Sequence, residues 1–199
     1  MQADRKREMI LEKASLRFAH FGIQKTTMNE IADDLSISKP SLYYYFPDKV
    51  GLVVAVIEKI VTDYQERLAI LFKDARNIKD AIFSMLDLRR EFLQKYFMLH
   101  LADFNDVHLT KQELKKSINH IRSNEIQLVK EVFEKGIQLN EIKSKNAEHS
   151  AELFVDMLAG INICVLARQE KQLVPDDKGF EEVLSKQKEL SVIFLNGIK

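Results

Sequence analysis

One stretch of the chain decides its fold, residues 26–49, which read TTMNEIADDLSISKPSLYYYFPDK. Thr27 and Glu30 have the spacing of a capping box. In this motif the threonine oxygen accepts from a backbone N–H of the first helical turn, and the glutamate accepts from the backbone N–H of the threonine. The box predicts a helix over residues 27–35, with its apolar side chains on one face.

A second short helix follows after a tight turn at residues 36–38. Ser38 can cap a helix over residues 39–45, and Pro40 falls in its first turn, where a missing N–H does no harm. Pro47 ends the helix, because the residue before a proline avoids helical angles. A nine-residue helix, a three-residue turn and a seven-residue helix have the geometry of a helix-turn-helix, whose second helix enters the major groove of DNA.

The second helix carries more polar and aromatic side chains than it can bury. Leu42 is expected in the core, whereas Lys39, Ser41 and at least two of the three tyrosines are expected at the surface. Hydroxyl groups, one cation and aromatic rings are suited to contacts with phosphates and base edges. Lys25 and Lys49 flank the helix pair and would meet the DNA backbone on either side.

The rest of the chain is also predicted to be helical. The sequence has only 6 glycines and 3 prolines, which leaves few strand connections. Apolar residues at three- and four-residue spacing predict helices over residues 4–21, 48–72, 78–101, 146–171 and 180–195, and either one helix or a helix pair over residues 110–136. We therefore expect an all-α protein, with a three-helix DNA-binding domain over residues 1–50 and a helical bundle over residues 51–199.

The charge balance does not by itself indicate a nucleic-acid ligand. The chain has 30 Lys and Arg against 30 Asp and Glu, and residues 1–50 have 8 against 7. Any affinity for DNA must therefore come from where the charges lie rather than from their sum. A hydrophobic content of 46% is typical of a folded protein rather than of a disordered one.

Cell location is predicted from three features. The charged start of the chain lacks the apolar core of a secretion signal. The apolar runs 50–57 and 157–167 are shorter than the roughly 20 residues that span a bilayer. The single cysteine, Cys164, excludes an internal disulfide and a cysteine-rich zinc site. We expect a cytoplasmic protein without a membrane segment.

The N-terminal residues resemble the signature of TetR-family repressors. The matching residues are Ile10, Ala14, Phe18, Gly22, Thr26, Thr27, Ile31, Ala32, Ser38, Leu42, Tyr43, Tyr44, Phe46, Lys49 and Leu52. The resemblance implies a homodimeric repressor that binds a palindromic operator and is released by a small-molecule effector, without a cofactor. It departs from the family at Ser36, where the turn usually has glycine, and at Met28, which cannot read a base by hydrogen bonding.

The DNA contacts that the resemblance and the surface argument predict are Lys25, Thr27, Met28, Ser38, Lys39, Pro40, Ser41, Tyr43, Tyr44 and Lys49. By the resemblance, Lys39, Pro40 and Ser41 lie at base edges, and the tyrosines and Lys49 contact the backbone. Thr27 is a helix cap that would also bind phosphate at the positive end of its helix. Met28 would touch a thymine methyl group or pack in the core. The basic run at residues 5–7 forms either an arm at the DNA or a frayed end.

The C-terminal domain offers candidates for an effector cavity. Aromatic and Met side chains with a few polar groups would suit a small apolar molecule. The candidates are Met85, Phe92, Tyr96, His100, Phe104, Phe133, Phe154 and Met157. The alternative is that these side chains simply fill the core.

The last two predicted helices have wide apolar surfaces and suit a four-helix interface with a second copy. The candidates for this dimer interface are Ala151, Val155, Leu158, Ala159, Ile163, Leu166, Val183, Leu184 and Phe194.

Two other classes of protein compete with this interpretation. An enzyme built on a helical bundle would need a catalytic motif, and neither a Gly-rich phosphate loop nor a Glu-x-x-His pair occurs. A metal site would have to be assembled from His100, Asp103, Asp106, His108 and His120, which are scattered loop and helix residues, so we expect none. A helical module that binds protein would also expose tyrosines, and a salt-dependent DNA-binding assay distinguishes it from a DNA-binding protein.

Overall fold

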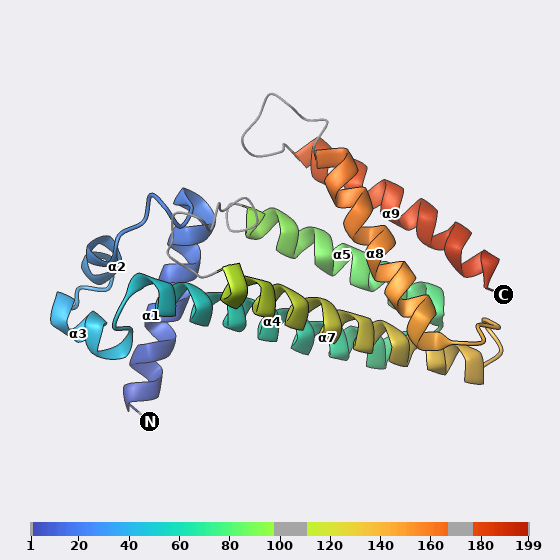
Figure 1. The fold of residues 1–199 in the computed structure, drawn as a ribbon, viewed down its shortest axis with the longest axis horizontal. Coiled ribbons are helices and arrows are strands. Elements are labelled where there is room, and N and C mark those ends of the chain that lie inside the picture. Colours follow the sequence, from blue (N-terminus) through green and yellow to red (C-terminus); the bar gives the residue numbers. More distant parts are fainter. Residues whose placement is uncertain (1, 98–110, 167–176, 199) are drawn as a thin grey trace. The chain divides into compact units, whose positions relative to one another are not determined.

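The computed structural model describes residues 2–97, 111–166 and 177–198, and every regular element in these ranges is a helix. The helices are α1 (Gln2–Phe21), α2 (Met28–Asp34), α3 (Lys39–Tyr45), α4 (Lys49–Asp74), α5 (Ile78–Lys95), α7 (Lys111–Gln138), α8 (Ala147–Leu166) and α9 (Asp177–Gly197) (Figure 1). The all-α prediction is confirmed. The last residues of the predicted helices 78–101 and 146–171 lie outside the described residues.

Contacts between residues divide the chain into two compact units. The N-terminal unit comprises Met1–Asp63 with Lys95–Ser117, and the C-terminal unit comprises Tyr64–Gln94 with Ile118–Lys199. The helices α4 and α7 each contribute a segment to both units. The domain boundary expected at residue 50 falls inside the N-terminal unit.

The core of the N-terminal unit is built from one face of each of its first four helices. Its fully buried side chains recur every three or four residues, as the helical period requires. They are Ile10, Ala14 and Phe18 of α1, Ile31 of α2, Leu42 of α3, and Leu52, Val53 and Val56 of α4. This packing holds α2 and α3 in place and leaves their outer faces to solvent.

The turn between α2 and α3 has a left-handed residue where the TetR resemblance would place glycine. Ser36 has a φ of 52°, a conformation that costs about 1–2 kcal/mol for a residue with a Cβ atom. The turn is closed by backbone hydrogen bonds from Ser36 N to Asp33 O, at 3.0 Å, and from Ile37 N to Ala32 O, at 3.0 Å. The turn therefore keeps its geometry at the cost of local strain.

The core of the C-terminal unit contains a cluster of three aromatic rings. The ring centroids of Phe133 and Phe154 lie 5.7 Å apart, and those of Phe154 and Phe194 lie 5.3 Å apart. Edge-to-face rings at these separations pack favourably. Met85 and Leu158 are fully buried in the same cluster.

Helix α8 is long and apolar enough, by length and composition alone, to cross a membrane. This was not expected from the sequence, in which the uninterrupted apolar run 157–167 is shorter than a bilayer span. Ala151, Phe154 and Leu158 on this helix are fully buried in the core of the C-terminal unit. Its apolar character therefore has an explanation in packing between helices.

Candidate nucleic-acid interface

The capping box predicted for α2 is present. Glu30 N donates to Thr27 Oγ1 at 3.3 Å, and Thr27 N donates to Glu30 Oε2 at 2.7 Å. The Thr27 hydroxyl also donates to Glu30 Oε2, at 2.8 Å. The hydrogen bonds from Thr27, together with the nearby Arg17 guanidinium, lower the pKa of Glu30. Both polar hydrogens of Thr27 are therefore occupied by a carboxylate, which a phosphate would have to displace.

Helix α3 exposes a row of polar and aromatic side chains. Ser38 caps the helix by accepting a hydrogen bond from Ser41 N at 3.3 Å. Lys39 and Pro40 are exposed, Ser41 is half-buried, and Leu42 is fully buried, as the sequence predicts. Among the aromatic residues of this helix, Tyr44 is 81% exposed and Tyr43 is 37% exposed, whereas Tyr45 packs against the core.

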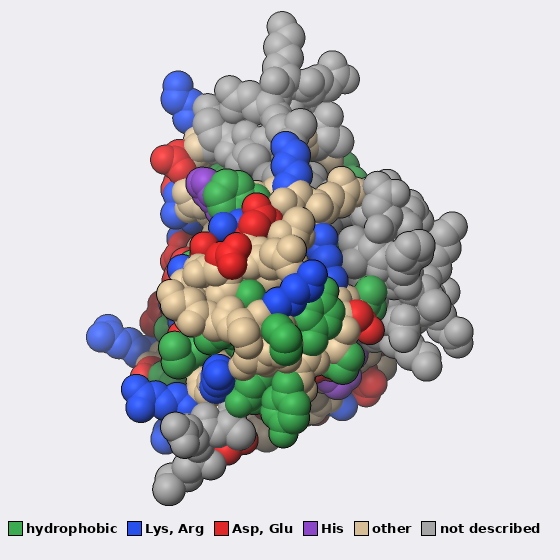
Figure 2. All heavy atoms as spheres, turned by 90° about the vertical axis from the view of Figure 1, so that its left-hand side faces the viewer, with side chains coloured by type: hydrophobic (Ala, Val, Ile, Leu, Met, Phe, Trp, Pro, Cys, Tyr) green, Lys and Arg blue, Asp and Glu red, His purple; other side chains and the backbone are tan. Residues whose placement is uncertain are grey.

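The two lysines that flank the helix pair have different surroundings. Lys25 is exposed. Lys49 is half-buried in the first turn of α4, and its Nζ lies 3.5 Å from the carbonyl oxygen of Gln24. Burial lowers the pKa of Lys49, and the Glu30 carboxylate partly opposes this effect. On the face shown in Figure 2, basic side chains stand among hydrophobic and acidic ones.

Met28 does not serve as a surface residue in this structure. It is 6% exposed and packs in the core of the N-terminal unit. The physical reason is its position one turn before Ile31 and Ala32, which lie on the same inward face of α2. Of the two alternatives for Met28, packing is the one observed, so we remove it from the candidate DNA contacts.

The basic run at the start of α1 lies against α3. Lys6 Nζ donates to Ser41 Oγ at 3.0 Å, and the Arg7 guanidinium lies 5.3 Å from the ring centroid of Phe46. The sequence left this run undecided between an arm and a frayed end, whereas in the structure it is helical from Gln2. No signal in the sequence links Lys6 to Ser41, because 35 residues separate them.

These features define the class of protein, a helix-turn-helix transcriptional regulator. The sequence profile described as "Bacterial regulatory proteins, tetR family" matches residues 10–56. A crystal structure of a transcriptional regulator from Cytophaga hutchinsonii ATCC 33406 is 31% identical, with a TM-score of 0.85, and the match covers 97% of this chain and 98% of that one.

Two curated relatives agree with this assignment. The uncharacterized HTH-type transcriptional regulator YhgD of Bacillus subtilis (strain 168) is 24% identical over 183 residues, which cover 89% of this chain and 91% of YhgD. The HTH-type transcriptional regulator RutR of Escherichia coli (strain K12) is 33% identical over 92 residues, which cover 45% of this chain and 43% of RutR. The chain belongs to the TetR family, whose members are transcriptional regulators and not enzymes.

Five of the eight residues predicted for an effector cavity pack in the core of the C-terminal unit. Met85, Phe133 and Phe154 are fully buried in the C-terminal unit, and Phe92 and Met157 pack against them. Tyr96 packs against the core of the N-terminal unit, so it does not join that group. The other two candidates, His100 and Phe104, lie outside the described residues. Among the described residues, no group of His, Cys, Asp and Glu is arranged to hold a metal ion.

Sequence reasoning missed a buried polar group in the C-terminal unit. Tyr64 Oη donates to Glu125 Oε1 at 3.1 Å, and the Arg89 guanidinium pairs with the same carboxylate oxygen. The side chains of Arg89 and Glu125 are only 17% and 10% exposed. A signal was present in the sequence, since Arg89 follows Ile82 by seven residues and Met85 by four, which places a charge on the apolar face of α5.

Burial and charge act together on this group. Burial raises the pKa of Tyr64, and the Glu125 carboxylate raises it further. Burial alone would lower the pKa of Arg89, but Glu125 and Tyr64 outweigh this effect and raise it. Tyr64 therefore stays neutral and Arg89 stays charged, and the Arg89 guanidinium lies against the Glu125 carboxylate.

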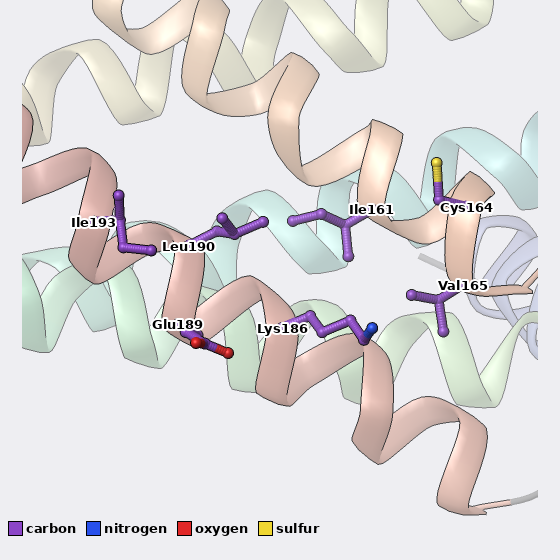
Figure 3. Close-up of a pocket in the computed structure, with 7 residues that line it drawn as sticks. All are labelled: Ile161, Cys164, Val165, Lys186, Glu189, Leu190 and Ile193. Atoms are coloured by element: carbon purple, nitrogen blue, oxygen red, sulfur yellow. The ribbon is translucent and has the colours of Figure 1, made fainter.

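The outer surface of α8 and α9 carries a hollow of about 310 Å³ (Figure 3). It is lined by Ile161, Cys164 and Val165 of α8 and by Lys186, Glu189, Leu190 and Ile193 of α9. Two of its lining side chains, Leu190 and Ile193, are 37% and 60% exposed, and α8 also exposes Leu153 (49%) and Ile163 (69%). The hollow together with these exposed side chains is named here the α8/α9 face.

Only part of the predicted dimer interface lies at the surface. Ala159 and Ile163 are exposed, and Leu166 and Phe194 are half-buried. The remaining five candidates are buried inside the protomer and cannot reach a second copy: Ala151, Val155, Leu158, Val183 and Leu184. The reason is that α8 is apolar on two faces, and the sequence does not show which of them faces the protomer core.

Proposed function

We propose that this chain is a repressor that binds a palindromic operator as a homodimer and is released by a small-molecule effector in the cytoplasm. The observation that carries the proposal is the exposed surface of α3, where Lys39, Pro40, Tyr43 and Tyr44 project from a helix anchored by Leu42. Such a surface matches the phosphate and base edges of a major groove. Lys25, Ser38, Ser41 and Lys49 complete the proposed contacts, and Thr27 joins them if phosphate displaces Glu30.

The α8/α9 face supports the homodimer. Apolar side chains as exposed as Ile163 and Ile193 (69% and 60%) gain free energy when a second copy covers them, by about 25 cal/mol for each Å² removed from water. Pairing the same two helices across a twofold axis gives a four-helix interface. A twofold protein presents two copies of α3, and this symmetry requires an operator with two inverted half-sites.

The effector is proposed to bind in the C-terminal unit and to be largely apolar. Two solved structures of the same fold contain ligands: a putative transcriptional regulator from Saccharomonospora viridis with choline (17% identity, TM-score 0.71) and FadR from Bacillus subtilis with stearoyl-CoA (15%, 0.70). In this chain the core around Met85 and Phe133 is filled, so an effector would have to select a more open conformation. The Tyr64, Arg89 and Glu125 group would then supply its polar contacts.

Selection from a pool of random duplexes tests the DNA-binding part of this proposal. We expect the wild-type protein to select an inverted repeat, and Tyr44→Ala and Lys39→Ala to bind that repeat at least about tenfold more weakly. Lys145→Ala serves as the matched control, because Lys145 is an exposed lysine of the C-terminal unit. Selection of no sequence, or of a single half-site only, would contradict the proposed operator.

A reporter gene placed behind the selected repeat tests the sign of regulation. Expression is expected to fall when the protein is produced and to recover with an effector. The family makes this test necessary, because a relative that is 28% identical over 105 residues is the transcriptional activator FasR of Mycolicibacterium smegmatis. A rise in expression would replace repression by activation and leave the DNA-binding proposal standing.

A further inference from the structure

Lys6 contacts Ser41, a half-buried serine of α3 that is one of the proposed DNA contacts. Its Nζ lies 3.0 Å from Ser41 Oγ, and the contact is partly buried. A lysine ammonium has three N–H donors and no acceptor. The Ser41 oxygen must therefore be the acceptor in this hydrogen bond, and one of its lone pairs is occupied.

The proton of the Ser41 hydroxyl is not used within the described part of the protein. Serine and threonine hydroxyls on helices often donate to the carbonyl four residues earlier, as Ser191 does to Gln187 O at 2.6 Å and Thr62 does to Glu58 O at 2.9 Å. No such bond is formed by Ser41, whose hydroxyl oxygen accepts from Lys6 and whose backbone N–H donates to Ser38 Oγ.

A free serine hydroxyl reads DNA ambiguously, because it can donate or accept a hydrogen bond. With Lys6 on one lone pair, the Ser41 proton points away from the ammonium group and is available to donate. Its partners in the major groove are acceptors, namely guanine O6 or N7, adenine N7 or thymine O4, and these are favoured over the amino groups of cytosine and adenine, which would have to share the serine oxygen with the lysine ammonium.

The position of Lys6 is fixed by its neighbours on α1. The Arg7 guanidinium lies over the Phe46 ring at the end of α3, with 5.3 Å between them, and Ile10 is fully buried one turn later. The Glu8 carboxylate pairs with Lys59 of α4. The start of α1 is thus held on the N-terminal unit, so Lys6 remains beside Ser41 and does not swing with a loose end.

We propose that Lys6 determines base specificity by fixing the Ser41 hydroxyl as a hydrogen-bond donor toward DNA. This role rests on the proposed function, since it requires α3 to enter the major groove. Lys6 is a positioning residue here, because it acts on the base through Ser41. Its remaining two donors can also approach a phosphate, and the test must separate that general attraction from an effect on base choice.

The experiment uses duplex selection with the wild-type chain and five variants, one of which is a control for charge. Ser41→Ala first identifies the base pair that Ser41 reads, as the position where the preference falls by about fivefold to tenfold. Lys6→Met keeps the aliphatic stem and removes the donor, and we expect the same loss at the same position. Lys6→Arg, which keeps both charge and donor, is expected to retain the preference. The double variant Lys6→Met with Ser41→Ala is expected to select the same sequences as Ser41→Ala alone.

Arg5→Met is the matched control for charge, because Arg5 is the exposed basic residue next to Lys6. It is expected to weaken binding to all sequences alike and to leave every base preference intact. A chemical probe gives a second readout. If Ser41 reads a purine N7, replacing that base by its 7-deaza analogue should weaken the wild type about fivefold and leave Ser41→Ala unchanged.

Three outcomes would overturn the role of Lys6. In the first, Lys6→Met weakens all sequences equally, as Arg5→Met does, and keeps the preference at the Ser41 position. In the second, Ser41→Ala loses affinity without losing any base preference. In the third, the base that Ser41 reads presents only a donor, as cytosine N4 does. A wild-type protein that selects no sequence would instead overturn the proposed function, so the two failures are distinguishable.

Discussion

The guanidinium of Arg17 on α1 donates two hydrogen bonds to the carboxylate of Asp34 at the end of α2, from Nε at 2.7 Å and from an Nη at 3.1 Å. The same guanidinium lies 3.4 Å from Glu30, which closes the capping box of α2. Lys13 adds a further contact to Asp34 at 3.8 Å. One arginine therefore joins both ends of α2 to α1, and so sets the orientation of the helix-turn-helix.

This arrangement predicts a dependence of stability on pH. Hydrogen bonding to Arg17 lowers the pKa of Asp34, and hydrogen bonds from Thr27, with the Arg17 charge, lower the pKa of Glu30. A carboxyl group whose pKa is lowered by folding stabilises the folded protein at pH values above its ordinary pKa, which is 3.8 for Asp34 and 4.5 for Glu30. That stabilisation is lost as the pH falls through the lowered pKa of the folded protein. We expect the melting temperature of Arg17→Ala to approach that of the wild type as the pH falls through this range.

Circular dichroism melts of the two proteins across the acidic range check this prediction. Arg122→Ala is a suitable control, because Arg122 forms a comparable surface pair with Asp156, at 2.8 Å, in the C-terminal unit. The Arg122→Ala substitution is expected to change the affinity for DNA only slightly. If Arg17→Ala lowers the melting temperature by the same amount at neutral and at acidic pH, the ion pairs do not contribute as described.

The buried pair of Arg89 and Glu125 predicts an asymmetric response to mutation. Arg89→Met removes the cation and leaves the buried Glu125 carboxylate without an opposite charge, which costs about 3–5 kcal/mol. The double variant Arg89→Met with Glu125→Leu removes both charges and is expected to regain most of that stability, because it also avoids the desolvation of two ions. Urea unfolding followed by fluorescence of the tyrosines measures the difference.

The control for this pair is the exposed ion pair of Arg67 and Glu91, at 2.6 Å, in the same unit. Arg67→Met is expected to change the unfolding free energy by less than about 1 kcal/mol, since an exposed pair is screened by water. Equal losses from Arg89→Met and Arg67→Met would show that burial is not what makes the Arg89 charge costly to remove.

The helix-turn-helix was predictable because its signals are local. The capping box of Thr27 and Glu30 and the break at Pro47 each act within a few residues, and the structure has all of them where they were expected. Burial of Leu42 follows from the same short-range pattern. What the sequence could not give was the contact from Lys6 to Ser41, which depends on how α1 crosses α3.

The C-terminal residues were predicted less well because their environment is set at long range. An apolar side chain on α8 can face the protomer core, a cavity or a second copy, and the three cases have the same sequence pattern. Leu158 and Ile163 illustrate this, because both were expected in the dimer interface, yet Leu158 is fully buried and Ile163 is 69% exposed. Phe133 and Phe154 likewise suit a cavity by residue type but pack against each other and Phe194.

Lys49 at the start of α4 predicts a change in the salt dependence of DNA binding. Each phosphate contact contributes about 0.9 to the slope of log affinity against log salt concentration. Lys49→Ala is expected to lower the slope by about this amount and to weaken all sequences nearly equally. Lys73→Ala, at the far end of the same helix, is expected to leave the slope unchanged. An unaltered slope in Lys49→Ala would remove Lys49 from the proposed phosphate contacts and leave its bond to Gln24 as its role.

The last prediction concerns the α8/α9 face. Ile163→Lys places a charge on the exposed surface of α8, within the proposed twofold interface, where each copy of it would be desolvated. We expect the dissociation constant of the dimer to rise at least about a hundredfold, with the loss of cooperative binding to an inverted repeat. Sedimentation equilibrium over a range of protein concentrations measures the first effect, and titration of a single half-site against the full repeat measures the second.

Ile70→Lys is the matched control, because Ile70 on α4 is 61% exposed and lies away from α8 and α9 in the sequence. A wild-type protein that sediments as a monomer, or an Ile163→Lys variant that dimerises as well as Ile70→Lys does, would contradict an interface on this face.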